Sequence, residues 1–456
     1  MARIETIHEL YNATLWDFKA EGNANIILSY NGENDIFSAV VLRLRKDNEI
    51  KFDTAVDPQF FTTSYVNFVM MPLLGSKYVG ESILLEVRPE FLKALSRAIL
   101  PLRSKKRIQN DIDFKQRYGM LTPNHTRFSV NINPTISVEL KPKWAFLPSS
   151  SFINCDNYVK LQSCRFCMHK YLNKDKRNPT RYCPLDLFSL EDKRVRKAIE
   201  SLINDPGSNL KLFIQGTQIE IGKENWQTRL YEFFEIDCPM LDDRKQKSDR
   251  VVDMLISLLI QAIMKEQDLF IKLKRLQKTL DELDIEGIDQ ILLTHQPKLS
   301  EPSLEEWKLI VNEYKKRTSD ENAFEITNMD DKQIRQRIYE YLISATLKDC
   351  SIIFAFQKSD YNGLGINNKQ GVAELQSQFY NYSSIFPERL QQISLTETQS
   401  AIYHNYNGSY KHYIYKVNVI DLDPKPLAKL HYYKELDTEI VKNYLKCTTI
   451  KKKCSE

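Results

Sequence analysis

The sequence of 456 residues has no long apolar run and no large excess of charge of one sign. No segment approaches the ~20 uninterrupted apolar residues that a membrane-crossing helix needs. The N-terminus, residues 1–5, lacks the apolar stretch of a signal peptide. We therefore expect an intracellular protein, cytoplasmic, nuclear or both, that contacts no membrane. The formal net charge is only +4, so any attraction for an anion must come from local clusters of Lys and Arg.

The cysteines do not form an evident metal motif. The chain has eight, and in an intracellular protein we expect them to be reduced. Cys164 and Cys167 form a C-x-x-C pair, with His169 beside it and Cys183 further on. A structural zinc site usually takes four ligands in two spaced pairs, and the second pair is missing here. We favour an interpretation of Cys164 and Cys167 as small buried residues at the start of a helix over a zinc site.

Internal repeats are also absent, and the composition is that of a globular protein, 42% hydrophobic and 27% charged. A chain of this length forms two or three structural units, because single cores stop growing at roughly 250–300 residues. Residues 26–28 and 40–44 are short β-branched runs that predict strands, and residues 90–100 repeat apolar side chains at helical spacing. We predict an N-terminal unit over residues 1–123 and a second unit over 124–456.

The second unit contains both strand and helix patterns. Four strands are predicted, at 136–141, 210–214, 350–356 and 413–420. Three helical regions are predicted, at 190–203, 251–283 and 334–347. Residues 284–330 are polar, and we expect loops there. Residues 358–411, rich in Asn, Gln, Ser and Tyr, predict a long surface insertion that is partly disordered.

The segment from Ala20 to Asn25 is a candidate phosphate-covering loop. Its small residues would let backbone N–H groups approach phosphate oxygens, although the same residues also suit a simple hairpin turn. The next strand carries Arg43 among apolar neighbours. A cation buried there needs an anionic partner, such as the phosphates of a nucleotide, whereas an arginine at a strand edge would face solvent.

A second constellation lies at Glu139, Lys141 and Lys143. Strand alternation predicts that the three side chains share one face. Such a face can accept a hydrogen bond from a ribose hydroxyl at one end and bind phosphates at the other. A solvated face of a sheet is the alternative interpretation.

A third constellation is the pair Arg165 and His169, with Lys170 or Lys174 nearby. The first two are four residues apart, so they share one face if the segment is a helix. Arg presents a planar fork of donors to phosphate, and an imidazolium adds charge once a phosphate is near. An ordinary helix surface is the alternative.

Two aspartates stand at strand boundaries, Asp349 before the strand at 350–356 and Asp421 after the strand at 413–420. Phosphoryl transfer needs one carboxylate near the attacking hydroxyl and another that holds Mg²⁺ on the nucleotide. Lys425 and Lys429 follow Asp421 at what we interpret as helical spacing. Aspartate is also a common residue at the end of a strand.

Taken in order, these motifs resemble the inositol-pentakisphosphate 2-kinase family. The matching stretches are residues 21–25, 71–75 (Met-Pro-Leu-Leu-Gly), 139–143 (Glu-Leu-Lys-Pro-Lys), 164–169 (Cys-Arg-Phe-Cys-Met-His), 182–188, 345–351 and 419–427. They span nearly the whole chain. The resemblance implies an α+β fold with two kinase-like lobes, a mainly β small lobe and a larger α/β lobe with a helical inositide-binding region. It also implies transfer of the γ-phosphate of ATP to the 2-hydroxyl of inositol 1,3,4,5,6-pentakisphosphate.

The resemblance also implies a role for each site residue. Asp349 would activate the 2-hydroxyl, with Lys141 as the second catalytic residue. The nucleotide and its Mg²⁺ would be held by Gly22, Asn23, Ala24, Asn25, Arg43, Asn124, His125, Glu139 and Asp421, of which Asp421 is the Mg²⁺ ligand. The substrate phosphates would be held by Arg107, Lys143, Arg165, His169, Lys174, Asn209, Lys211, Lys425, Lys429 and Tyr433.

Some positions differ from the family pattern. Ala20 stands where glycine is common, and Asn173 stands where lysine is common, which leaves Lys174 as a shifted substitute. Plant members carry a zinc-binding C-x-x-C pair in the second lobe, but residues 284–330 contain no cysteine, so zinc is not expected. We expect ATP and Mg²⁺ as cofactors, no nucleic-acid partner, and a monomer. Two alternatives remain open, an inositol polyphosphate kinase of different regiospecificity and a polyanion-binding protein without turnover.

Overall fold

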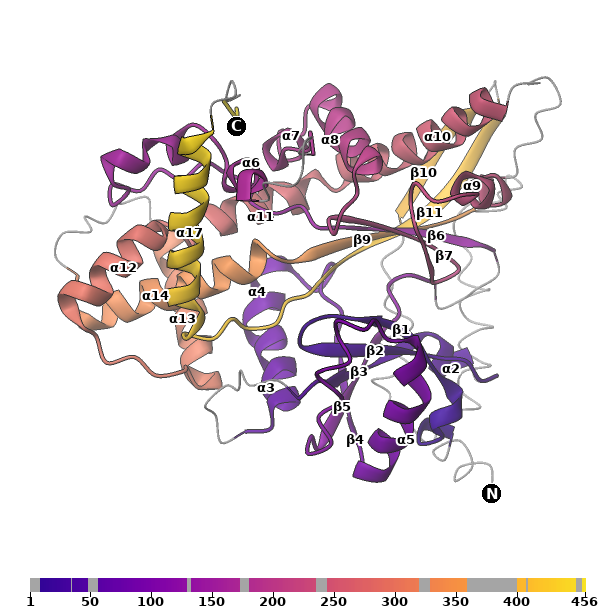
Figure 1. Ribbon diagram of the computed structural model, residues 1–456, viewed down its shortest axis with the longest axis horizontal. Coiled ribbons are helices and arrows are strands. Elements are labelled where there is room, and N and C mark those ends of the chain that lie inside the picture. The colour runs from indigo at the N-terminus through magenta and orange to yellow at the C-terminus, as the bar shows by residue number, and fades with distance from the viewer. Residues whose placement is uncertain are drawn as a thin grey trace.

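The computed structural model of the protein has an α+β architecture with two antiparallel sheets (Figure 1). The residues that it describes are 9–33, 35–47, 56–128, 133–172, 180–234, 244–319, 329–358, 400–406, 409–447 and 453–456. The smaller sheet has five strands and the larger has six. In Figure 1 the smaller sheet lies below the larger one, and most helices gather around the larger sheet.

The five-stranded sheet has the order β1-β2-β3-β5-β4. Its strands are β1 (Trp16–Glu21), β2 (Asn25–Tyr30), β3 (Val40–Arg45), β4 (Ile83–Glu86) and β5 (Tyr118–Pro123). The strands predicted at 26–28 and 40–44 are confirmed as β2 and β3. Their alternate side chains, among them Ile26, Leu28 and Leu42, are fully buried in a core that α5 (Pro89–Ile99) completes.

The helix α5 follows from its sequence. Pro89 occupies the first turn, where a missing N–H costs nothing, and Phe91, Leu92, Leu95 and Ile99 form one buried face. The helix predicted at 90–100 is thus confirmed. The remaining short elements of this part are η1 (Ala13–Leu15), α2 (Asp35–Ser38) and η3 (Leu100–Leu102).

The six-stranded sheet has the order β10-β11-β9-β6-β7-β8. Its strands are β6 (Thr135–Leu140), β7 (Leu210–Ile214), β8 (Thr217–Ile219), β9 (Ser351–Lys358), β10 (Ser400–Tyr406) and β11 (Ser409–Ile420). All four strands predicted in the second unit are confirmed. Every residue of β6 is buried, as expected for a central strand between two neighbours.

Helices pack around this sheet and form the larger part of the molecule. They are α3 (Pro58–Tyr65), η2 (Val66–Met70), α4 (Met71–Leu74), η4 (Cys155–Leu161), α6 (Arg165–His169), η5 (Lys170–Leu172), α7 (Pro184–Leu187), α8 (Asp192–Asn204), α9 (Trp226–Phe234), α10 (Arg244–Lys265), α11 (Gln267–Thr279), α12 (Asp284–His295), α13 (Leu304–Ser319), α14 (Asp331–Leu347) and α17 (Lys429–Lys446). The helices predicted at 190–203 and 334–347 are confirmed as α8 and α14. None of the helices in the described residues is both long and apolar enough to span a membrane.

Three expectations need correction. The predicted helical region 251–283 is two helices, because the backbone leaves the helical conformation at Glu266 (φ −101°, ψ 27°). Residues 284–330 do contain a loop, at 296–303, but two helices that were not predicted, α12 and α13, cover much of the stretch. Gly287 lies inside α12, where a Cβ atom would approach the Phe152 ring to 2.9 Å, so this glycine allows close packing and does not end the helix. Of the predicted insertion 358–411, the described residues at its C-terminal end form strands, and residues 359–399 lie outside the described part.

Two main hydrophobic cores accompany the two sheets. The smaller contains residues of the five-stranded sheet and α5. The larger contains the six-stranded sheet and its helices, and it also includes Phe61, Tyr65 and Val69 from α3 and η2. A segment before residue 124 therefore packs into the larger core, and a division into two units at residue 123 stays a prediction.

Lys160 is a buried cation in the part of the molecule around the larger sheet, with 2% exposure. Its ammonium group donates to Asp284, to Glu286 at 2.9 Å and to Asp437 at 2.8 Å. Burial lowers the pKa of Lys160, but Asp284 and Asp437 raise it by more, so it stays charged. The contacts join η4, α12 and α17, and hence fix the helix that follows Asp421 in the chain.

We expect Lys160→Met to lower the free energy of unfolding by about 3 kcal/mol, because removal of one partner leaves buried carboxylates without a cation. Urea denaturation measures the change. Lys316→Met, which removes an exposed lysine paired with Glu313, is the control and should change stability by less than about 0.5 kcal/mol. Equal stabilities of the two variants would contradict the structural role of Lys160.

Candidate active site

Three strand ends meet at one edge of the six-stranded sheet. β6 pairs with β9 so that Leu140 lies opposite Ile352, and β9 pairs with β11 so that Ser351 lies opposite Ile420. The chain segments that leave β6 and β11 and the segment that enters β9 therefore lie side by side. These segments carry Lys141, Asp421 and Asp349, which are far apart in the sequence.

Asp349 lies between two lysines. Its carboxylate accepts from Lys143 at 3.0 Å and from Lys425 at 3.3 Å. Burial raises the pKa of the Asp349 carboxyl, but Lys143, Lys425 and Lys141 lower it by more, and its pKa is about 2. Asp349 is therefore ionised throughout the physiological pH range, and its two lysine contacts come from segments that the sequence analysis had placed at the substrate.

Asp421 is the second carboxylate of the site. It accepts from Lys141 at 3.1 Å and from the Ser351 hydroxyl at 3.2 Å. Desolvation raises the pKa of Asp421, but Lys141, with Arg43 and Lys211, lowers it below its ordinary value. Both Asp421 (φ 61°) and Lys143 (φ 65°) have left-handed backbone, a strained conformation that tends to occur at functional sites.

Arg43 pairs with Asp423, two residues after Asp421. The expectation that a cation at this place in β3 needs an anionic partner is thus confirmed. The other Asp423 oxygen, Oδ1, is buried and has no hydrogen-bond partner among the described residues. The five-stranded and six-stranded sheets are therefore linked by an ion pair at the site.

The loop between β1 and β2 ends close to this ion pair. The Gly22 N–H donates to the Asn25 carbonyl at 2.8 Å and closes a hairpin, and the Asn25 amide donates to Asp423 at 3.3 Å. Lys46 and Arg103 both contact the Glu21 carboxylate, which holds the end of β1 in place. The segment is a hairpin turn whose end lies beside Asp423. That it covers phosphates stays a prediction.

Glu139 and the connector after β5 carry the other residues that were expected to meet the nucleotide. Glu139 accepts from Lys211 at 2.9 Å and from Ser351 at 3.1 Å. The Asn124 side chain accepts from the Thr126 hydroxyl at 2.8 Å, so it shapes the turn after β5. Burial, with Lys416 nearby, lowers the pKa of His125 to about 3, and this imidazole is neutral at pH 7.

A cavity of about 540 Å³ lies next to Asp349. This volume is within the range of small-molecule sites, roughly 300–1,000 Å³. Its lining includes seven of the predicted residues, namely Lys143, Arg165, His169, Asn209, Asp349, Lys425 and Tyr433. Partial desolvation, with Arg165 and Lys143, lowers the pKa of His169. The structure therefore brings together six of the ten predicted substrate residues, from four separate segments of the chain.

Several predicted residues lie elsewhere. Arg107 donates to the Glu21 carbonyl beside the β1–β2 hairpin and is not part of the cavity lining in the described structure. Lys211 contacts Glu139, and Lys429 lies 5.2 Å from the ring of Tyr432, a lining residue. Lys174 lies outside the described residues.

Two expectations about local structure are wrong. β6 ends at Leu140, so Lys141 and Lys143 lie beyond the strand and do not extend its alternation. Lys425 and Lys429 do not share a helix, because α17 begins only at Lys429. Lys141, Lys143 and Lys425 still reach the site, since the irregular segments after β6 and β11 run along the same edge of the sheet.

The sequence analysis missed Trp144, Tyr341 and Lys348, which also line the cavity. Lys348 is buried, pairs with Asp281, and lies 3.9 Å from the Trp144 ring centroid. The Arg165 guanidinium also lies over this ring, with its Cζ atom 5.2 Å from the ring centroid. Lys348 could have been found from the sequence, because it directly precedes Asp349. Asp423 was also missed, although its spacing from Asp421 is visible in the sequence.

Carboxylates at strand ends, beside a cavity lined by cations, define a site of the kind that transfers phosphoryl groups. The chain belongs to the inositol-pentakisphosphate 2-kinase family, whose model matches residues 18–439. Among its relatives, the inositol-pentakisphosphate 2-kinase of rice (Oryza sativa subsp. indica) is 28% identical over 458 residues, which is 94% of this chain and 93% of the relative.

Two further relatives come from a plant and a fish. The inositol-pentakisphosphate 2-kinase of Arabidopsis thaliana is 27% identical over 478 residues, 97% of this chain and 95% of that protein. The zebrafish (Danio rerio) inositol-pentakisphosphate 2-kinase is 25% identical over 497 residues, 95% of this chain and 93% of that protein. The resemblance drawn from the sequence motifs is confirmed.

Proposed function

We infer that this protein is a kinase that transfers the γ-phosphate of ATP to the 2-hydroxyl of inositol 1,3,4,5,6-pentakisphosphate, giving the hexakisphosphate. The observation that carries this inference is the cation-lined cavity with Asp349 in its wall. A pentakisphosphate carries several negative charges, and a single surface lysine gains little from one phosphate in water. Cations from several segments, gathered in one cavity, supply the attraction that the small net charge of +4 does not.

The nucleotide would lie between the two sheets, which form a small and a large kinase-like lobe. The β1–β2 hairpin and Arg43 stand on one side, and Glu139 and Asp421 stand on the other. Asn124 and His125, on the connector between the sheets, would face the adenine. Arg43 pairs with Asp423 in the free protein. A bound nucleotide phosphate would take the place of this carboxylate as the partner of Arg43.

The donor set also suits Mg²⁺, which prefers carboxylate and phosphate oxygens. Asp421 is the proposed ligand, and the unpartnered Oδ1 of Asp423 offers a second oxygen two residues away. When bound, the metal would neutralise charge on the β- and γ-phosphates. Lys141, at 3.1 Å from Asp421, would supply further positive charge at the same edge of the sheet.

In the transfer step, the bond between the γ-phosphorus and the bridging oxygen of ATP breaks while a bond to the inositol O2 forms. The hydroxyl proton passes to Asp349. With a pKa of about 2, Asp349 is a weak base in the free protein. Because Lys143 and Lys425 are also the proposed phosphate ligands, bound substrate would engage them and let the pKa of Asp349 rise. A loose transition state needs little deprotonation of the nucleophile, so Asp349 mainly orients the hydroxyl and accepts its proton late.

ADP formation tests this function directly. Purified protein with ATP, Mg²⁺ and inositol pentakisphosphate is expected to release ADP. The hexakisphosphate, which has no free hydroxyl, is the matched control and should release none. Tight binding of both inositides without ADP release would contradict the kinase assignment and favour a polyanion-binding protein.

We expect His169 to make inositide binding depend on pH. In the free protein its pKa lies below the ordinary value, and a bound phosphate would raise it. Binding thus takes up a proton, so this contribution to affinity is complete below the free pKa and is lost as pH rises through the bound pKa. From about pH 8 to pH 6 the native protein should gain about tenfold more affinity than His169→Gln.

Calorimetric titrations of the two proteins over this pH range measure the difference. The substrate phosphates titrate in the same range, and the comparison cancels that contribution because it is common to both proteins. Parallel curves for the native protein and His169→Gln would remove His169 from phosphate binding.

A further inference from the structure

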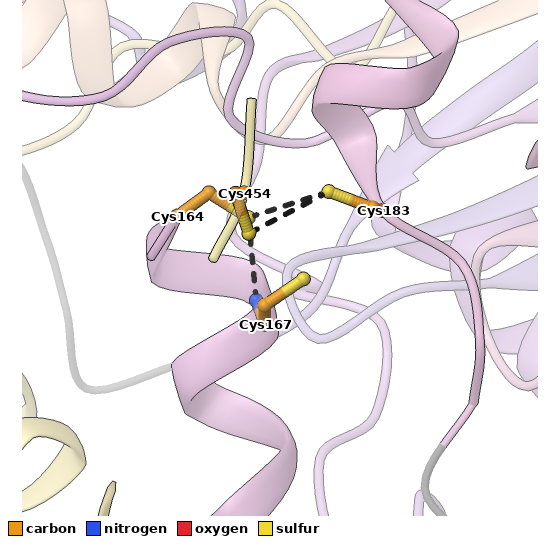
Figure 2. A group of neighbouring side chains, drawn as sticks. All are labelled: Cys164, Cys167, Cys183 and Cys454. Atoms are coloured by element: carbon orange, nitrogen blue, oxygen red, sulfur yellow. Dashed lines mark hydrogen bonds between the residues drawn. The ribbon is translucent and has the colours of Figure 1, made fainter. Parts of the chain in front are cut away.

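Four cysteines from three distant segments meet at one point. Figure 2 shows Cys164 and Cys167 at the start of α6, Cys183 before α7, and Cys454 on the C-terminal segment 453–456. Their four sulfur atoms all lie within 4.8 Å of one another. The prediction that Cys164 and Cys167 lack a second pair is therefore wrong, because Cys183 and Cys454 supply it.

The distances between the sulfurs are those of metal ligands and not of disulfides. Cys183 Sγ lies 3.9 Å from both Cys164 Sγ and Cys454 Sγ, and all four cysteines are free. A disulfide would require about 2.05 Å. Four thiolates arranged tetrahedrally around zinc, each at about 2.3 Å, would place the sulfurs about 3.8 Å apart. The two distances from Cys183 match the edge of that tetrahedron.

The surroundings of the sulfurs favour thiolates, the form of cysteine that binds a metal. The Cys167 N–H donates to Cys164 Sγ at 3.4 Å, and Lys170 Nζ lies 3.6 Å from Cys167 Sγ. Four thiolates and one Zn²⁺ carry a net charge of about −2, which an N–H donor and a lysine offset. Such outer contacts are usual for thiolate ligands of metals.

The C-terminal segment is held at the site by contacts of its own. The Cys454 N–H donates to the Gln162 carbonyl at 2.9 Å, Arg194 donates to the Ser455 carbonyl, and Glu456 pairs with Lys274 at 3.4 Å. The fourth sulfur is thus delivered by a segment with defined packing. A set of four protein ligands leaves no open position, which is typical of structural and not catalytic zinc.

We propose that Cys164, Cys167, Cys183 and Cys454 bind one structural zinc ion, which ties the C-terminal segment to the start of α6. This site is distinct from the plant C-x-x-C site, whose expected region, residues 284–330, has no cysteine. α6 is only five residues long and presents Arg165 and His169 to the cavity. Met168 packs against α17 and Phe166 packs against the larger core, and the metal would add a further anchor at the start of the helix.

Metal analysis of the full-length protein, purified without chelators, tests the proposal. We expect about one zinc per chain by mass spectrometry of the metal content. A chelating dye should withdraw zinc faster from Cys454→Ser than from the native protein. The increase in rate should exceed the roughly 10–100-fold loss of metal affinity that removal of an outer contact causes. Cys155→Ser, which removes an exposed cysteine outside the cluster, is the matched control and should release zinc at the native rate.

Cobalt provides a second measurement that does not depend on activity or on a variant. Native protein loaded with Co²⁺ should show the sulfur-to-metal charge-transfer band and the intense visible bands of a tetrahedral thiolate site. Protein that lacks stoichiometric zinc, or that holds iron in its place, would overturn the proposal. Equal rates of zinc release from Cys454→Ser and Cys155→Ser would also overturn it. These readouts are independent of the kinase reaction, so either assignment can fail alone.

Discussion

Replacement of Asp349 with asparagine is expected to lower kcat by at least about 10³-fold, within the range that general acid–base groups contribute. Asparagine keeps the size of the side chain but cannot accept the hydroxyl proton. ATP binding should be unchanged, because the Asp349 carboxylate contacts Lys143 and Lys425 and not the residues proposed to hold the nucleotide. Steady-state kinetics and ATP titration measure the two effects separately.

The same variant should bind the pentakisphosphate more tightly than the native protein. Loss of the carboxylate frees Lys143 and Lys425 for substrate phosphates and removes a repelling charge from the cavity wall. Asp253→Asn, which alters a surface pair with Arg196, is the control and should change kcat by less than about twofold. Near-normal kcat in Asp349→Asn would remove Asp349 from the role of base.

Replacement of Lys141 with methionine is expected to lower kcat/KM by about 10³-fold, the loss seen when one group that stabilises transition-state charge is removed. Lys141 lies 3.1 Å from Asp421, and Asp421 and Asp349 raise its pKa above the ordinary value despite desolvation, so it is a cation. Without Lys141, the negative charges of Asp421 and Asp349 are less well neutralised when the phosphates of the substrates approach. Initial rates at saturating ATP and Mg²⁺ measure the loss.

Lys434→Met is the matched control for Lys141→Met. Lys434 pairs with Asp289 at 3.2 Å and its side chain is 28% exposed, against 21% for Lys141. The control should stay within about twofold of native activity. A Lys141→Met protein that kept most of its activity would contradict the assignment of the residues 139–143 to the reaction site.

Six of the eleven strands in the described part of the chain were predicted from the sequence, and the helices only in part. β2, β3 and β7 were found because β-branched runs bounded by turn residues have few alternatives. Residues 251–283 were interpreted as one helical region because a buried break at Glu266 leaves the apolar pattern intact. There the Glu266 carboxylate accepts from Lys77 at 2.6 Å and from Tyr78 at 2.7 Å, tertiary contacts that no local pattern contains.

The polar stretch 284–330 misled for a related reason. α12 begins with the acidic residues Asp284 and Glu286, which look solvent-exposed in sequence but are buried against Lys160. Their partner lies more than a hundred residues earlier in the chain, so the charge balance that allows their burial becomes visible only in the folded structure.

Many residues of the candidate site could be named from the sequence, but their positions in space could not be predicted. Their order along the chain pointed to Asp349, Asp421 and Lys141, and the strand register then brought them to one edge. Asp423 and Lys348 were missed because each stands within two residues of one that already had a proposed role. The fourth cysteine, Cys454, could not be found by spacing, since it lies nearly 300 residues after Cys164 in the chain.

The identity of the phosphorylated product tests the central claim most directly. Incubation of the protein with ATP, Mg²⁺ and inositol 1,3,4,5,6-pentakisphosphate, followed by anion exchange and NMR of the product, reports which hydroxyl has reacted. We expect inositol hexakisphosphate, phosphorylated at the 2-position, with one ADP formed for each molecule. A product that keeps a free 2-hydroxyl, such as a pentakisphosphate extended to a diphosphate, would contradict it.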